Sequence, residues 1–464
     1  MIKNWNDLLT RQRIDRAAGV IQRLCLLVMI VVELLFFLPG EAADNIVYLF
    51  LEWRLVDISV IFLAASCCRK TWGQSKWFFL LGLGMVLWFY ILRGIHLRSE
   101  GINQDPGAFV CAYLLCLPFA AAAGDEENSW GLKALACVFT LTGAAFGLYA
   151  VLLVTGHLPA WLDGYVFWDG ARFGVMGHPN ICATIFMISI GLMVGYALTT
   201  KRLWLKYPLL FLAALEFWAL SMTNSRAAIV LTCALLGGIA FCRIRGTGWK
   251  RLLPALAAAA VVMVLLFFVS RMIFQWNGDR LTEMARQAQQ TGEEIGLTLN
   301  ESGNLKTENG QGTFAKSMKN LNGRTEIWAA AMESLRDNPW ILLTGTERTG
   351  EIISPYWKMD VQHAHNAWIQ TLFQLGIPGL LVSVLLTGLA AWDGVTLLWR
   401  NDRLIPSCVA LVTLCLMGCA VMEPYLFTVY AQFHYFDFLF MLCLGYLNQW
   451  RRQTSNGKGV MQNV

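Results

Sequence analysis

Residues 363–379 read HAHNAWIQTLFQLGIPG, and they mark the border where a long polar segment returns to an apolar one. Two histidines and an asparagine stand at this border, and a Gly-Ile-Pro-Gly break at 376–379 precedes the next apolar run. Because an unperturbed imidazole titrates near pH 6.5, a histidine pair at a water–membrane border suggests proton chemistry. Two interfacial histidines at the start of a helix are the structural alternative.

The composition around this border is that of a polytopic helical membrane protein. Of the 464 residues, 56% are hydrophobic and 14% are charged, and the 19 Trp and 27 Phe fit aromatic belts at two interfaces. Apolar runs of about 18 or more residues recur along almost the whole chain, and each is long enough to span a bilayer. The alternating pattern of a transmembrane β-barrel is missing. The net charge of +5 does not indicate nucleic-acid binding, because the basic residues cluster in short loops.

We therefore predict an all-α fold with about 12 transmembrane helices and one large extracytoplasmic loop. Its parts are a cytoplasmic lead-in (1–19), nine spans (20–271), the loop (272–364), the C-terminal spans (365–449) and a cytoplasmic tail (450–464). The predicted spans are 20–38, 46–65, 77–93, 107–123, 132–155, 181–199, 205–221, 226–242, 253–271, 365–398, 404–422 and 434–449.

The charges of the loops indicate the orientation of the chain. With the N-terminus in the cytoplasm, most basic loops obey the positive-inside rule, and only Arg93 and Arg98 are exceptions. The basic segments on the cytoplasmic side are then 69–76, 201–206, 243–251, 400–403 and 451–452. This orientation places the large polar loop, and any site built on it, on the outer face.

Two features are predicted inside the large loop and after it. The middle of the loop, 291–322, is rich in Gly, Asn, Thr, Glu and Lys and is predicted to be mobile. Residues 323–340 carry apolar side chains at helical spacing and predict an amphipathic helix that Asn338-Pro339 ends. The run 365–398 is too long for one straight span, and its Gly-Ile-Pro-Gly break predicts a kink.

Three arginines are candidates for binding an anion, since a guanidinium offers fixed donors that match phosphate oxygens. Arg226 stands at the outer end of the eighth span, where snorkelling to the interface is the alternative. Arg324 opens the loop helix, where a basic residue opposes the helix dipole, so that a use other than helix stability is favoured. Arg172 begins the segment Arg-Phe-Gly-Val-Met-Gly-His-Pro-Asn.

The end of that segment carries two more polar candidates. His178 is a second candidate histidine, with a structural hydrogen bond in a turn as the alternative, and Asn180 is placed to cap the next span. Acids at span ends or within spans are candidates by their position in the membrane, but no pair has the spacing of a catalytic dyad. These acids are Glu33, Asp57, Glu216, Glu423 and Asp437.

Motifs for metals and cofactors are missing from the sequence. The 13 Cys lie in or next to apolar runs without the spacing of a zinc site, so they are interpreted as small buried hydrophobes. A phosphate-binding glycine loop, a dinucleotide fingerprint and a serine nucleophile elbow are absent as well. We expect no metal and no cofactor, and we expect the substrate itself to supply the energy of the reaction.

Four short motifs together resemble the O-antigen ligase/polymerase family of bacterial envelope enzymes. The ligase pattern is His followed by Asn, Ser or Gln, then nine residues and Gly-x-x-Gly, which His365-Asn366 and Gly376-Ile-Pro-Gly379 match. The family also shows an Arg…Gly…His-Pro-Asn segment, a Ser-Arg at an outer span end and a Gly-Arg that opens the loop helix. The residues that match these are 172–180, Ser225-Arg226 and Gly323-Arg324.

The resemblance implies a membrane glycosyltransferase with a GT-C-like helical fold in the bacterial cytoplasmic (inner) membrane. Its donor would be a glycan on undecaprenyl diphosphate, and its acceptor a sugar hydroxyl on another glycan or a lipid core. Arg226 and Arg324 would meet the charge of the leaving diphosphate, and His365 would be the general base. The residues expected to bind substrate are Arg172, His178, Asn180, His363 and Asn366.

Several alternatives stay open at the level of sequence. A repeat-unit polymerase differs from a ligase only in its acceptor, and Leu380-Leu381 stand where the ligase pattern often ends in Thr-His. A flippase or transporter for lipid-linked sugars would show internal repeats, which are not evident, and would have no use for the large loop. A peptidoglycan polymerase lacks the His-Asn…Gly-x-x-Gly signature. A transferase that glycosylates Ser or Thr of exported proteins is a further alternative.

Overall fold

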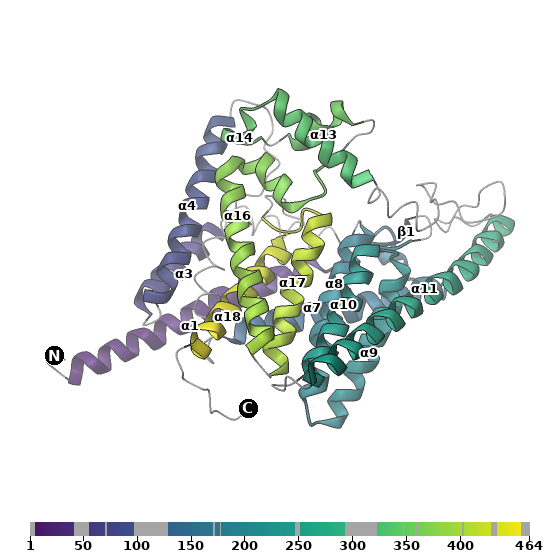
Figure 1. Ribbon diagram of the computed structural model, residues 1–464, viewed down its shortest axis with the longest axis horizontal. Helices are drawn as coiled ribbons and strands as arrows, with labels where there is room; N and C mark the ends of the chain where they lie inside the picture. The colour runs from purple at the N-terminus through teal and green to yellow at the C-terminus, as the bar shows by residue number, and fades with distance from the viewer. Residues whose placement is uncertain are drawn as a thin grey trace. The chain divides into compact units, whose positions relative to one another are not determined.

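The chain forms two compact units, each with helices that are candidates for membrane spans. Figure 1 labels the helices and strands along the chain. Unit 1 comprises Met1–Leu135, Gly323–Leu397 and Ala420–Val464, and unit 2 comprises Ala136–Asn322 and Leu398–Cys419. The computed structural model describes residues 5–40, 55–69, 72–96, 129–169, 172–176, 178–245, 251–292, 323–346, 348–357, 361–400, 403–427 and 434–455.

The described residues are mainly helical, as the sequence predicted. The helices that lie wholly or mostly in unit 1 are α1 (Trp5–Phe36), α3 (Leu55–Cys68), α4 (Trp72–His96), α13 (Arg324–Asp337), α14 (Ile341–Thr344), α15 (Thr349–Ile353), η5 (Ser354–Tyr356), α16 (Ala367–Arg400) and α18 (His434–Ser455). Those of unit 2 are α7 (Ser129–Val154), η2 (Ala160–Leu162), α8 (Pro179–Thr199), α9 (Leu203–Met222), α10 (Arg226–Arg245), α11 (Leu252–Thr291) and α17 (Leu404–Met422).

Eight helices of the described chain are long and apolar enough to cross a membrane. They match eight of the twelve predicted spans, so the polytopic helical class is confirmed. Two further predicted spans, 46–65 and 77–93, overlap the shorter apolar helices Asp57–Cys68 and Lys76–Leu92. The predicted span 107–123 lies outside the described residues, as does most of the segment predicted to be mobile. The span predicted at 434–449 falls in α18, which is not among the eight.

Two helices are longer than the sequence analysis predicted. The lead-in and the first span form one continuous helix, α1, rather than two parts. Helix α11 runs for 40 residues to Thr291, about 20 residues past the predicted end of its span. Its extension is amphipathic: Asn277, Leu281, Ala285 and Ala288 recur at helical spacing and are all buried, which explains why the helix continues beyond the apolar run.

A small β-hairpin is a departure from the all-α prediction. Strand β1 (Val166–Asp169) pairs with β2 (Arg172–Val175) antiparallel, with Val166 opposite Val175. Phe173 and Val175 are fully buried in unit 2, so the hairpin is fixed by apolar side chains of β-favouring types. Only a turn was predicted for this segment, from Gly174, Gly177 and Pro179.

Unit 2 is packed around α8, a helix that is apolar on all sides and therefore buried along most of its length. A buried carboxyl group inside this unit has a hydrogen-bond partner. Ser189 of α8 donates a hydrogen bond of 2.9 Å to Glu216 Oε1 of α9. A Cβ atom at Gly143 of α7 would lie only 2.7 Å from the same carboxylate oxygen, so a glycine there makes room for the carboxyl group.

Unit 1 combines a membrane part with a small domain built from the end of the loop. Gln22 of α1 donates to Ser66 of α3 at 2.8 Å, and the indole of Trp88 in α4 donates to the carbonyl of Leu375 in α16 at 2.8 Å. The small domain has an apolar core of its own. This core comprises Ile327, Ala330, Ala331, Leu335, Ile341, Ile353, Val361, Ala364 and Phe373. It confirms the predicted amphipathic helix, which is α13 and ends at the C-cap Asn338.

The predicted break in the long run 365–398 is a kink inside α16. Gly376 has a φ of 66° and is not helical, so two helices meet at this residue. A Cβ atom at Gly376 would lie 2.9 Å from the carbonyl oxygen of Leu343, which shows how closely the end of α14 approaches the kink. Both the left-handed backbone and this contact require glycine, and they give the first glycine of the Gly-x-x-Gly motif a structural reason.

Candidate active site

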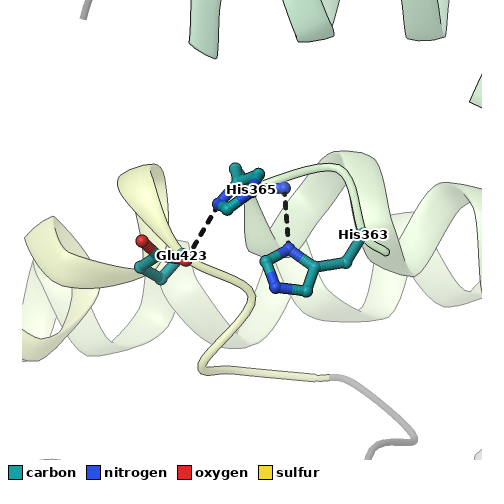
Figure 2. Close-up of side chains that lie close together, drawn as sticks. All are labelled: His363, His365 and Glu423. Carbon is teal, nitrogen blue, oxygen red and sulfur yellow. Dashed lines mark hydrogen bonds and ion pairs between the residues drawn. The ribbon is translucent and has the colours of Figure 1, made fainter. Parts of the chain in front are cut away.

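The histidine pair lies on a short loop that leads into α16, in unit 1 (Figure 2). The backbone N–H of His365 donates to Nδ1 of His363 at 3.3 Å, and the two rings are 4.2 Å apart. His365 has a φ of 48°, the left-handed region that residues other than glycine rarely adopt. Strained backbone of this kind concentrates at functional sites, because the surrounding structure has to hold it in place.

Two buried amides hold this loop. Oε1 of Gln370 accepts a hydrogen bond from the N–H of Ala364 at 2.9 Å, and its Nε2 donates to Oγ1 of Thr349 at 3.2 Å. Asn366 is the N-cap of α16, since its Oδ1 accepts from the backbone N–H groups of residues 368 and 369, both at 3.0 Å. Its Nδ2 also donates to the carbonyl of Val421 at 3.0 Å. Asn366 thus has a structural role, and the binding of substrate by it stays a prediction.

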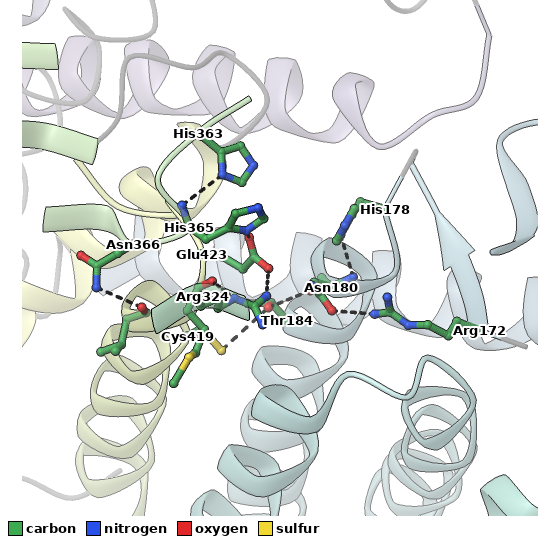
Figure 3. A network of polar contacts seen from close by, with 12 residues as sticks. Arg172, His178, Asn180, Thr184, Arg324, His363, His365, Asn366, Cys419 and Glu423 are labelled. Atoms are coloured by element: carbon green, nitrogen blue, oxygen red, sulfur yellow. Dashed lines mark hydrogen bonds and ion pairs between the residues drawn. The ribbon is translucent and has the colours of Figure 1, made fainter. Parts of the chain in front are cut away.

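Glu423, just past the end of α17, connects His365 with Arg324. Its Oε2 lies 3.1 Å from Nδ1 of His365, while its Oε1 forms an ion pair with Nη2 of Arg324. Nε of Arg324 also donates to the carbonyl of Met422 at 2.8 Å. Three residues from three separate parts of the chain therefore meet in one cluster, His365–Glu423–Arg324, and all belong to unit 1 (Figure 3).

The environment of Glu423 keeps its carboxylate charged. The side chain is 8% exposed. Burial alone would raise its pKa, but the hydrogen bond with His365 and the positive charge of Arg324 outweigh burial and hold the pKa of this carboxyl well below its usual range. A charged carboxylate next to an imidazole favours the tautomer that carries its proton on Nδ1. The second ring nitrogen, Nε2, is then the one with a lone pair.

The two histidines and Glu423 are also the group that could hold a metal ion among the described residues. One ligand atom from each of His363, His365 and Glu423 lies within 4.8 Å of the others. No metal was expected from the sequence, since no metal-binding spacing was found. Glu423 stands 58 residues from His365, so this group has no local pattern.

Unit 2 has a polar cluster of its own, which Figure 3 also shows. Arg172, the first residue of β2, donates from Nη2 to Oδ1 of Asn180 at 2.8 Å and from Nε to the carbonyl of Thr223 at 3.0 Å. Asn180 was predicted to cap α8, but the cap is His178. Nδ1 of His178 accepts a hydrogen bond from the N–H of Asn180 at 3.1 Å. Pro179 occupies the first helical position, so the cap lies two residues before the predicted one.

Arg226 stands at the start of α10, next to the turn that carries Asn224. Asn224 has a φ of 49°, and its Oδ1 lies 3.5 Å from Nη1 of Arg271 in α11. Asn224 thus links Arg271 to the turn that stands two residues before Arg226. Arg226 begins α10, and Arg271 is bonded to the turn before it; two cations near one helix start are suited to an anion.

The structure thus brings together His365, His363 and Arg324 in unit 1, and Arg172, His178 and Asn180 in unit 2. Sequence reasoning missed three residues in or near these clusters. Glu423 was noted only as one acid among several, and Gln370 and Arg271 were not singled out. The sequence signal for Gln370 is a glutamine inside an apolar run. The structure shows that this amide is fully buried, where it needs hydrogen-bond partners.

A comparison with protein families finds a match that includes several of these residues. Residues 208–384 match the model of the O-antigen ligase family. Over this segment the chain is similar to O-antigen ligases. The match confirms the family that the sequence motifs predicted, although it covers less than half of the chain. Among curated proteins, none is similar enough to the chain to give a match.

The matched segment includes Arg226, Arg324 and both histidines of the loop, whereas Glu423 lies beyond its last residue. Together with the eight candidate spans, the match supports a multi-pass protein of the bacterial inner membrane. It also supports a transferase of the O-antigen ligase or polymerase type, which acts on lipid-linked glycans in polysaccharide biosynthesis.

Proposed function

We propose that this protein is a membrane glycosyltransferase that moves a glycan from undecaprenyl diphosphate to a sugar hydroxyl, in the manner of an O-antigen ligase. The observation that carries the proposal is the cluster His365–Glu423–Arg324, in which a carboxylate is shared by an imidazole and a guanidinium. A base that is oriented by a third group is the arrangement that activates a hydroxyl nucleophile.

In the proposed reaction, the acceptor hydroxyl attacks the anomeric carbon of the donor glycan. The proton of this hydroxyl passes to Nε2 of His365, a new glycosidic C–O bond forms, and the bond to the diphosphate oxygen breaks. The electron pair of the broken bond leaves with undecaprenyl diphosphate. Glu423 keeps Nδ1 of His365 protonated during this step and stabilises the imidazolium that forms.

The charges of the cluster support this assignment. Before the transfer, the positive charge of Arg324 and the negative charge of Glu423 cancel, and the proposed reaction requires a neutral imidazole. When His365 accepts a proton, the cluster gains one positive charge while the leaving diphosphate gains negative charge. Fixed charge that matches the charge developed in the transition state lowers the barrier. Arg226 and Arg172, in unit 2, are proposed as diphosphate-binding residues from the sequence motifs, and His178, Asn180, His363 and Asn366 as substrate-binding residues.

We also propose that both termini lie in the cytoplasm and that the reaction takes place on the outer face of the membrane. The charges of the loops support this orientation through the positive-inside rule. A transfer on this face needs no nucleotide, because the diphosphate ester of the donor is itself the activated bond.

The experiment uses the purified full-length protein in detergent with a glycan on undecaprenyl diphosphate, and it follows the release of undecaprenyl diphosphate with several acceptors. Wild type is compared with His365→Ala, and the matched control is His157→Ala, an exposed histidine of unit 2. We expect release by wild type and by the control, and a loss of about 10² to 10⁴ in His365→Ala, the usual contribution of a general base.

The other outcomes separate the alternatives. Equal release from wild type and His365→Ala would keep the enzyme and dismiss His365 as its base. Release that lengthens a chain of identical repeat units would indicate a polymerase instead of a ligase. No release with any acceptor, but movement of the donor across the membrane of a vesicle, would indicate a flippase.

A further inference from the structure

The cluster around Glu423 has a second chemical property besides its use as an oriented base. Imidazole nitrogen and carboxylate oxygen are the donors that zinc and related divalent ions prefer, and two histidines with one glutamate form a known kind of three-ligand set. We propose that His363, His365 and Glu423 bind one divalent cation of this class and that the bound ion inhibits the transferase. The site stands on the geometry alone, whereas the inhibition rests on the proposed function.

The distances fit a tetrahedral ion after a small movement. With ligand distances of 2.0–2.1 Å, two ligands of a tetrahedral ion are about 3.3 Å apart. Nδ1 of His365 and Oε2 of Glu423 are already 3.1 Å apart. One ligand atom on each of the three residues lies within 4.8 Å of the other two, so a displacement of the His363 ring by about 1.5 Å closes the set.

The neighbours of the cluster allow this change. The ring of His363 is partly exposed, so rotation about its side-chain torsions does not require the core to move. Arg324 is bound to the other carboxylate oxygen, Oε1, and leaves Oε2 as a single ligand atom on the side of the histidines. The ion pair with Arg324 lowers the charge that Glu423 offers, which favours reversible binding over a permanent structural ion.

Inhibition follows from the tautomers of imidazole. The proposed mechanism needs a proton on Nδ1 of His365 and a lone pair on Nε2. An ion bound at Nδ1 displaces the proton of that nitrogen to solvent, so a neutral ring must then carry its proton on Nε2. The nitrogen that would accept the proton of the acceptor hydroxyl is blocked, and Glu423 no longer orients the ring.

The test measures the binding of Zn²⁺ directly, with protein purified by a tag that contains no histidine. Calorimetric titration of wild type should give one ion per chain, and Co²⁺ should give the visible absorption bands of a tetrahedral site. Changes to groups that only hold the ligands cost about tenfold or more in metal affinity. We therefore expect loss of a ligand itself, in His363→Ala, His365→Ala or Glu423→Gln, to weaken binding at least about tenfold. His157→Ala should bind as wild type does. Thermal unfolding of each variant shows whether it is folded.

Activity is then measured as release of undecaprenyl diphosphate. We expect Zn²⁺ to lower the turnover of wild type at least tenfold and EDTA to restore it. Whatever turnover His363→Ala retains should be inhibited only at tenfold higher Zn²⁺ or above. Binding that does not change in the three folded variants would overturn the site. Binding without inhibition, or turnover that EDTA abolishes and Zn²⁺ restores, would overturn its inhibitory role. If wild type without metal shows no transfer, the proposed function fails while the titration still decides on the metal site.

Discussion

Nδ1 of His365 lies 3.1 Å from Oε2 of Glu423, although the two residues are 58 positions apart and belong to different helix ends. His365 lies just before α16 and Glu423 lies just after α17, so both residues stand at helix ends and not on a helix face. Termini and the loops beside them are places where the backbone can adopt unusual conformations, such as the φ of 48° at His365. The pairing makes the role of Glu423 the most direct test of the site.

Replacement of Glu423 by Gln should lower the turnover of donor by about 10² or more, because the amide keeps the shape of the side chain but removes the charge that stabilises the imidazolium. The measurement is the release of undecaprenyl diphosphate at saturating donor. The matched control is Glu333→Gln, an exposed acid of α13. Equal losses in both variants would show that the effect is not specific to the cluster.

Gln370 is predicted to act as a positioning residue for the histidine loop. Gln370→Leu leaves the N–H of Ala364 and the hydroxyl of Thr349 without these partners, which should cost about 1–3 kcal/mol of stability. Gln370→Glu keeps an acceptor for Ala364 and should retain more activity than the leucine variant. Thermal unfolding and the separate values of kcat and KM check this prediction. A leucine variant with normal kcat would show that the loop does not depend on Gln370.

The kink of α16 gives a test of the Gly-x-x-Gly motif. Gly376→Ala should destabilise the protein by about 1–2 kcal/mol or more, because a left-handed backbone is unfavourable for alanine and its Cβ would lie 2.9 Å from the carbonyl oxygen of Leu343. Gly388 lies in the same helix with open space where a Cβ would stand, so Gly388→Ala is the control. It should be neutral or stabilising by up to about 1 kcal/mol. Unfolding in detergent distinguishes the two substitutions.

Arg271, a residue of unit 2, is predicted to contribute to the binding of the diphosphate. Because Arg271 is bonded to Asn224, two residues before Arg226, an anion bound at this helix start should gain from both positive charges. Arg271→Gln should raise the KM for donor by roughly tenfold, equal to about 1.4 kcal/mol, with a smaller effect on kcat. Arg280→Gln, an exposed arginine further along α11, is the control. A KM that does not change in Arg271→Gln would remove this residue from the donor site.

The sequence by itself determined the features that depend on composition and local pattern. Long apolar runs predicted eight spans that the helices match, and the spacing of apolar residues predicted α13. The Gly-Ile-Pro-Gly break predicted the kink of α16, because proline and glycine act on the backbone wherever they stand. Short motifs were sufficient to indicate the O-antigen ligase family, since they combine local chemistry with order along the chain.

Only the tertiary structure decided which polar groups meet. Glu423 was one acid among several in the sequence, and its ion pair with Arg324 joins residues 99 positions apart. Local pattern also failed where a tertiary contact outweighed it: buried side chains turned a predicted turn into the β-hairpin, and a buried face extended α11 to Thr291. A partner that is distant in the chain leaves no periodic signal, because its contact depends on packing and not on spacing.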